Sequence, residues 1–110
     1  MKREIHLKKI PFRNNNLTWL VDENGLVTIR VDHTGIANFI VQKLFKKPKS
    51  SYIHLEEFGS FIWANIDGKR NIFDIGTLVK ERFGAKSEPL YERLVTYLQT
   101  LEKNNFIATN

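Results

Sequence analysis

One turn, Asn24-Gly25, constrains the fold of this sequence more than any other feature, because it separates two stretches of alternating apolar and polar residues. The stretches 17–21 and 27–31 both have the two-residue period of a half-buried strand. Asn-Gly readily adopts the positive φ angles that a tight hairpin turn requires. The sequence therefore predicts an antiparallel β-hairpin over residues 17–31.

A third strand and three helices are predicted after this hairpin. Residues 51–55 favour an extended conformation, and the chain then turns directly into a helix over about residues 56–66. A second helix is expected from its cap Asn71 to Gly84, and a third from about 88 to 103. Strands followed by helices predict a single α+β domain over the 110 residues, with three helices on one face of a small antiparallel sheet.

The remaining segments are predicted to be accessory to this domain. Residues 1–16 are expected to form an irregular arm, because Pro11 interrupts any regular element there. Residues 32–50 are expected to form an inserted short helix and a basic linker. We favour a capping helix with solvated lysines for this insertion, although it could also cover the third strand or contact a partner. A short tail at 106–108 is expected to pack back on the domain.

Composition points to a cytoplasmic protein. The sequence contains no cysteine, which excludes disulfides and thiolate metal sites and fits a cytosolic location. No apolar run approaches the roughly 18 residues that a membrane span needs. The basic N-terminus lacks the apolar stretch of a signal peptide. We therefore expect a soluble intracellular protein without a membrane partner.

The charge is distributed unevenly along the chain. Residues 1–50 contain ten Lys and Arg against four Asp and Glu, whereas residues 51–110 contain seven against eight. A basic N-terminal half suggests an acidic partner, either a nucleic acid or an acidic peptide. A solvated basic surface that keeps the protein soluble is the simpler alternative.

No pattern of catalytic or metal-ligating residues is evident. His6, His33 and His54 lie in different predicted elements, and none of their spacings is typical of metal ligands. The adjacent Glu56-Glu57 pair is explained by the positive end of a helix dipole. The nucleophile-elbow and phosphate-binding glycine motifs are both absent from the sequence. We therefore expect no catalytic residue, no metal and no cofactor, and predict a protein that is not an enzyme.

A winged-helix DNA-binding protein is the main alternative, since the size, the basic pI and the predicted elements suit such a module. A recognition helix should, however, expose mainly Arg or Lys. The third predicted helix instead carries two basic against three acidic residues, and most of the excess charge lies at 2–13 and 43–49. Nucleic acid is therefore an unlikely partner.

The third predicted helix has an unusually wide apolar face. On a helical wheel its core stripe falls within about 60° and contains Leu90, Leu94, Tyr97 and Leu101. Tyr91, Val95 and Leu98 extend this stripe to one side. The extension could pack on the second helix or on the tail, or it could form the wall of a groove. If the third strand lies at the sheet edge, its unpaired backbone groups could bind an extended peptide in that groove.

The second half of the chain carries a distinctive series of motifs. After the strand-to-helix junction at Leu55 come Gly59-x-x-Ile62-Trp63, Ile66-Asp67-Gly68-Lys69-Arg70, Ile72-x-x-Ile75 and a Leu-rich last helix that ends at Phe106-Ile107. This combination resembles the PqqD family, which includes the precursor-peptide recognition elements of pathways for ribosomally made, modified peptides (RiPPs). The resemblance covers about residues 51–107.

The resemblance implies a winged-helix-like domain of three strands and three helices that acts as a peptide chaperone. Such members bind the leader of a precursor peptide as an added strand and present it to a modifying enzyme, often a radical SAM enzyme. The implied edge is Ser51, Tyr52, Ile53, His54 and Leu55, and the implied helix wall is Tyr91, Leu94, Val95 and Leu98. Trp63 and Gly68 would be structural. A PqqD-like protein with another protein partner is a third possibility, and we expect a monomer or a weak dimer.

Overall fold

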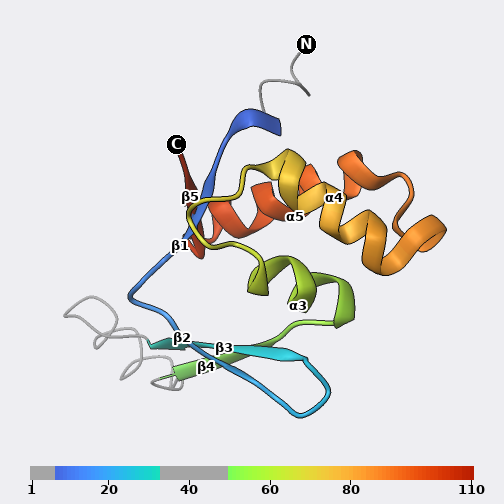
Figure 1. Ribbon diagram of the computed structural model, residues 1–110. Coiled ribbons are helices and arrows are strands. Elements are labelled where there is room, and N and C mark those ends of the chain that lie inside the picture. Colours follow the sequence, from blue (N-terminus) through green and yellow to red (C-terminus); the bar gives the residue numbers. More distant parts are fainter. Residues whose placement is uncertain (1–6, 33–49) are drawn as a thin grey trace.

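The computed structural model describes residues 7–32 and 50–110, and its elements follow the predicted α+β order (Figure 1). The strands are β1 (Pro11–Arg13), β2 (Thr18–Val21), β3 (Val27–Asp32), β4 (Ser50–His54) and β5 (Ile107–Thr109). The helices are α3 (Glu57–Ala64), α4 (Ile72–Phe83) and α5 (Leu90–Lys103), and the 3-10 helix η1 (Gly84–Ser87) precedes α5. The predicted fold class is confirmed, whereas the inserted helix predicted within 32–50 lies almost wholly outside the described residues.

β2, β3 and β4 form an antiparallel sheet with β3 in the centre. Trp19, Ile29 and Ile53 lie opposite one another across it. The predicted hairpin is confirmed, and its turn contains Gly25 at a φ of 81°. The Asp22 carboxylate stabilises this turn by accepting hydrogen bonds from the backbone N–H groups of Asn24 and Leu26, at 2.8 and 2.9 Å.

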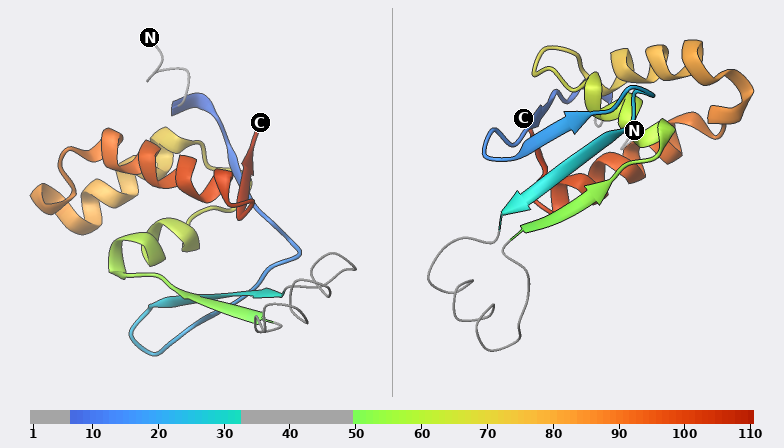
Figure 2. Two further views of the ribbon diagram at one scale, coloured as in Figure 1. Left: turned by 180° about the vertical axis from the view of Figure 1, so that it is seen from behind. Right: turned by 90° about the horizontal axis from the view of Figure 1, so that it is seen from below.

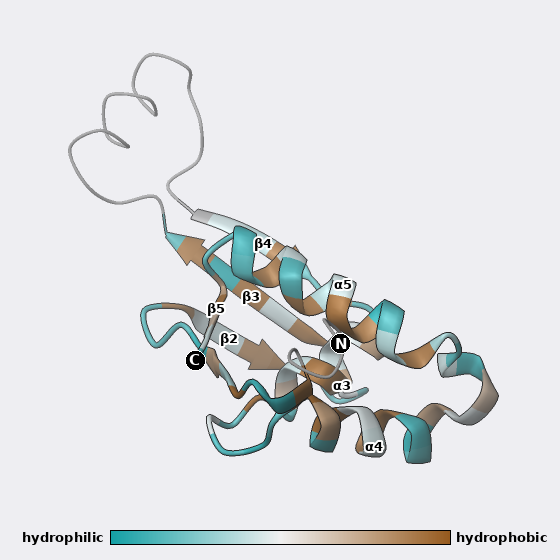
Figure 3. Ribbon diagram, turned by 90° about the horizontal axis from the view of Figure 1, so that it is seen from above, coloured by the Kyte–Doolittle hydropathy of each residue, from teal (hydrophilic) through white to brown (hydrophobic). Residues whose placement is uncertain are grey.

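The helices lie on one side of the sheet, as Figures 1 and 2 show. α3 packs directly on the sheet, and α4 and α5 lie beyond it. Seen from above or below, α5 overlies β4 in projection and runs in the opposite direction (Figures 2 and 3). The apolar residues of all these elements meet in one core. Its buried members are Val27, Ile29, Ile62, Trp63, Ile66, Ile72, Ile75, Val79, Leu90, Leu94, Leu98, Leu101 and Ile107.

A buried serine ties the sheet to the first helix. The Ser60 hydroxyl accepts a hydrogen bond from the Val27 backbone N–H at 2.8 Å and donates one to the Leu55 carbonyl at 3.2 Å. The Leu55 N–H in turn donates to the Val27 carbonyl at 2.8 Å. The side chain of Ser60 is almost fully buried, so these bonds are shielded from water. The closed ring fixes the start of α3 against both β3 and the end of β4.

The expectation of an irregular N-terminal arm is wrong for Pro11–Arg13. This segment is strand β1, which pairs antiparallel with β5 near the C-terminus. Pro11 is tolerated because it is the first residue of a two-stranded ribbon, where no further strand needs its missing N–H. The expectation that the C-terminal tail packs back is confirmed, since Ile107 is buried in the core.

The Asp67-Gly68-Lys69-Arg70 motif forms a turn between α3 and α4. The Asp67 carboxylate accepts hydrogen bonds from the backbone N–H groups of Arg70 and Lys69 and from the Arg70 guanidinium. These backbone donors, that of Arg70 first, hold the pKa of Asp67 below its ordinary value. Gly68 has a φ of 75°, and a Cβ there would lie 2.9 Å from the Phe12 ring. The expected structural roles of Gly68 and of the fully buried Trp63 are therefore confirmed.

The start of α4 is capped as the sequence predicts. The Asn71 side chain accepts a hydrogen bond from the Asp74 N–H at 2.8 Å, and the Asp74 carboxylate accepts one from the Asn71 N–H at 3.1 Å. This reciprocal pair is a capping box. It fixes the residue at which the turn after α3 becomes helix.

Replacing Ser60 with Ala should lower the free energy of unfolding by about 1–3 kcal/mol, because the Val27 N–H would be left buried without a partner. Urea unfolding measures this loss. Thr77→Ala is the matched control, since its hydroxyl donates only to a carbonyl of its own exposed helix face and its loss should stay within about 0.5 kcal/mol. Equal stabilities of the two variants would contradict the role assigned to Ser60.

Candidate functional site

β4 is, with β2, one of the two outer strands of the three-stranded sheet among the described residues. The Leu55 N–H, directly after this strand, donates to β3. Backbone groups of an antiparallel strand alternate between its two sides, so those of Ile53 face β3 while those of Tyr52 and His54 face the opposite side. No described strand pairs with that side of β4. The strand therefore has the backbone orientation that an added strand requires.

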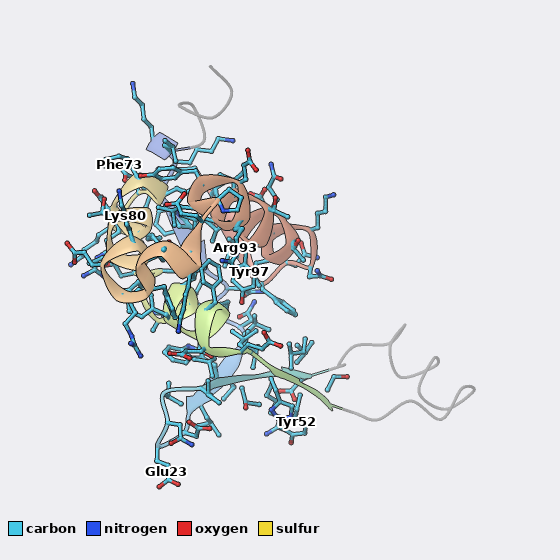
Figure 4. The ribbon with its side chains drawn as sticks, turned by 90° about the vertical axis from the view of Figure 1, so that its right-hand side faces the viewer. Glu23, Tyr52, Phe73, Lys80, Arg93 and Tyr97 are labelled. Carbon is cyan, nitrogen blue, oxygen red and sulfur yellow. The ribbon has the colours of Figure 1, made fainter. Side chains whose placement is uncertain are left out.

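The side chains of β4 lie on both faces of the sheet. Ile53 packs toward the helices as part of the core's periphery. Tyr52 is exposed on the outer face and points away from the helices (Figure 4). The His54 ring also lies on the outer face, where its Nδ1 is 3.0 Å from the Thr28 hydroxyl. The predicted edge thus offers its backbone within the plane of the sheet, while these two side chains lie on the face away from the helices.

An open groove of about 460 Å³ lies where α3, just after β4, faces α5. Its lining residues are Phe58, Pro89, Glu92, Arg93, Thr96, Tyr97 and Thr100. Phe58 is held against Phe83 at a ring-centroid distance of 5.5 Å. Arg93 and Tyr97 lie together on the face of α5 that Figure 4 presents to the viewer. The groove therefore combines an aromatic floor with a polar helix wall.

Tyr97 lines this groove and is half-buried. Its ring lies against Gly59 of α3, and a Cβ at that glycine would be 2.9 Å from the ring carbon Cζ. The absence of a side chain at Gly59 therefore makes room for this ring. The Tyr97 hydroxyl is buried and has no hydrogen-bond partner among the described residues. Burial raises the pKa of Tyr97 to about 12.

The four residues of the helix wall predicted from the sequence do not line this groove. Leu94 and Leu98 are buried in the core and line no open groove between α3 and α5. Tyr91 stacks on Phe73 of α4, with ring centroids 6.3 Å apart. Val95 lines a small cavity on that same flank of α5, together with residues of the N-terminal segment and β5. Tyr91 and Val95 also line an open hollow of about 330 Å³, which is smaller than the groove between α3 and α5. Peptide contact at these four residues stays a prediction, and the geometry favours the opposite flank of α5.

The residues that the sequence analysis missed are therefore Phe58, Arg93, Thr96, Tyr97 and Thr100. The helical wheel contained a signal for them, because Arg93, Thr96 and Thr100 lie on the flank next to Tyr97. The apolar residues of the wheel, taken alone, indicate the flank of Tyr91 and Val95 instead. Only the packing of Tyr97 on α3 shows which flank faces the groove beside β4.

Comparison with known proteins agrees with this arrangement of elements. The family model described as coenzyme PQQ synthesis protein D (PqqD) matches residues 28–107, which include β3, β4 and all three helices. The chain belongs to the PqqD family. This membership confirms the resemblance and supports a peptide-binding accessory role for the protein. No curated protein and no solved structure matches the chain significantly.

The described residues of this PqqD-family chain contain neither a candidate membrane helix nor a candidate metal site. None of its helices there is both long enough and apolar enough to cross a membrane. Within the same residues, His, Asp and Glu side chains form no cluster of three that could hold a metal ion. His54 lies with Thr28, whereas His6 and His33 lie outside the described residues.

A double-mutant cycle tests the packing of Tyr97 on Gly59. Gly59→Ala alone should destabilise the protein by about 1–3 kcal/mol, because the new methyl group meets the Tyr97 ring. In a Tyr97→Ala background the same change should stabilise by about 0.5–1 kcal/mol, because alanine is the better helix former. Urea unfolding of the four proteins gives both values. A Gly59→Ala effect of the same sign in both backgrounds would contradict the contact.

The raised pKa of Tyr97 predicts a loss of stability at alkaline pH. Deprotonation is easier in the unfolded chain, near the ordinary pKa of 10.0, than in the folded protein at about 12. The stabilisation is therefore complete below pH 10 and is lost as the pH rises toward 12. Relative to Tyr97→Phe, the wild-type protein should lose on the order of 1 kcal/mol over this range, since partial exposure screens the effect. If the free energy of unfolding depended on pH in the same way in both proteins, the Tyr97 hydroxyl would not be shielded from water.

Proposed function

We propose that the protein binds the leader segment of a ribosomally made precursor peptide as an added strand along β4. One observation carries this proposal: the backbone of Tyr52 and His54 faces a side of β4 that no described strand occupies, and Phe58, four residues after His54, lines the groove between α3 and α5. Main-chain hydrogen bonds along the edge would hold the peptide, and the groove would receive alternate side chains. The family assignment supports this accessory role.

The bound peptide would then be presented to a modifying enzyme, for which the family resemblance suggests a radical SAM enzyme. In this function the chain itself supplies no catalytic group. A peptide bound along β4 has one side on the protein and the other exposed, which leaves its flanking segments accessible to an enzyme. The N-terminal half, with its excess of Lys and Arg, would attract an acidic leader at low ionic strength. A cytoplasmic location stays a prediction.

A proline on the edge strand tests strand addition directly. Tyr52→Pro removes a backbone N–H that points away from β3, so the sheet keeps its ladder bonds while the edge loses a donor. The probes are peptides selected from a phage-displayed library of random sequences on the wild-type protein. Their affinity for Tyr52→Pro should fall about tenfold or more, since a bound peptide carbonyl would lose its partner.

Tyr52→Ala is the matched control, because it removes the exposed side chain and keeps the N–H, and its affinity should stay close to that of the wild type. Amide chemical shifts locate the site: the largest changes should fall on residues 50–54 and on Arg93, Thr96, Tyr97 and Thr100. Changes centred on Tyr91 and Val95 would place the peptide on the other flank of α5. Shifts on adding duplex DNA, with no peptide selected, would favour the nucleic-acid alternative.

A further inference from the structure

Arg93 is held in one position at the edge of the groove. Its guanidinium lies over the Phe58 ring, 4.2 Å from the ring centroid. One of its N–H groups donates a hydrogen bond to the Lys86 carbonyl at 2.6 Å. A stacked and hydrogen-bonded guanidinium loses little further conformational freedom when a ligand binds. The exposed Arg93 is thus preorganised rather than free to sample solvent.

No carboxylate pairs with Arg93 among the described residues. The arginines that form ion pairs there are Arg30, Arg70 and Arg82, each with a nearby Asp or Glu. Glu92 lines the same groove but forms no ion pair with Arg93. A guanidinium has five N–H donors in a planar fork that fits a carboxylate. Arg93 therefore presents unused donors to the groove.

We propose that Arg93 selects peptides by binding the carboxylate of an Asp or Glu side chain in the bound strand. This inference rests on the proposed function and names the chemistry that the groove recognises. Arg93 contributes the charge, and the aromatic floor of Phe58 and Tyr97 receives an apolar side chain next to it. The site would therefore recognise two peptide residues, one acidic and one apolar.

The geometry also fixes the spacing of these two residues. Arg93 and Tyr97 are four residues apart on α5, which is about 6 Å along the axis. Alternate residues of a strand are about 6.6–6.8 Å apart and lie on the same face. α5 overlies β4 in the views from below and above (Figures 2 and 3), so an acidic and an apolar side chain two positions apart in the peptide match the spacing of Arg93 and Tyr97.

The order of the two residues follows from the direction of the added strand. α5 is antiparallel to β4, and Arg93 lies nearer the start of α5 than Tyr97 does. An antiparallel addition to β4, the slightly more stable pairing, runs parallel to α5. In a peptide added in this direction, the acidic residue precedes the apolar residue, which gives the pattern Asp/Glu-x-apolar. A parallel addition would reverse the order.

Peptide selection on two variants tests this specificity. The library is fused to phage through its C-terminus, so that side chains alone can supply a carboxylate. Peptides selected on the wild-type protein should share Asp/Glu-x-apolar, and selection on Arg93→Glu should lose the acidic preference. Arg82→Glu is the matched control with the same change in net charge, because Arg82 pairs with Glu57 and does not line the groove. It should select the same pattern as the wild type.

Affinities of one selected peptide complete the test. Arg93→Ala should weaken its binding about tenfold, or about 1.4 kcal/mol, and so should Asp→Asn in the peptide. The two changes together should weaken binding no further, because they remove the same contact. Selected peptides without a shared acidic position, or independent effects of the two changes, would overturn the role of Arg93 and leave the proposed function intact. Failure to select any peptide on the folded wild-type protein would overturn both.

Discussion

The hydroxyl of Ser60 is the contact on which the geometry of the site depends. It satisfies a backbone N–H of β3 and the carbonyl that ends the β4 segment, and it does so from within α3. A short strand that leads directly into a helix has few residues with which to define the angle between them. The buried hydrogen bonds supply that definition, because any other angle would leave polar groups without partners.

This fixed junction determines what lies beside the open edge of the sheet. Once α3 is set against the sheet, Gly59 admits the Tyr97 ring, and this contact sets the rotation of α5 about its axis. The core leucines of α5 then point inward, and its polar flank lines the groove. The position of the edge strand and the shape of the groove thus follow from one packing arrangement. The motif Gly59-x-x-Ile62-Trp63 comes soon after the strand because it supplies the residues of α3 that make this arrangement.

Local signals in the sequence predicted most of the fold. The Asn24-Gly25 turn, the Asn71 cap and the periodicity of the helices each act within a few residues. The β1–β5 pair could not be predicted in this way, because its partners are nearly a hundred residues apart. The groove-lining flank of α5 escaped prediction for a related reason. A helical wheel identifies the buried side, but the neighbour of each flank depends on where α3 and α4 lie.

The polar character of the α5 flank is consistent with a division of roles at the site. Main-chain hydrogen bonds to β4 can hold almost any extended peptide, so they contribute affinity without selectivity. Selectivity then depends on the side chains of the groove, and an apolar wall alone would discriminate poorly among apolar peptides. A fixed guanidinium beside an aromatic floor excludes more sequences, because a peptide without a carboxylate leaves the donors of Arg93 unmatched. The cavity on the flank of Val95 is lined by both Lys9 and Glu102 and by no arginine, and its volume is only about 40 Å³, which is the physical reason to favour the flank of Arg93 and Tyr97.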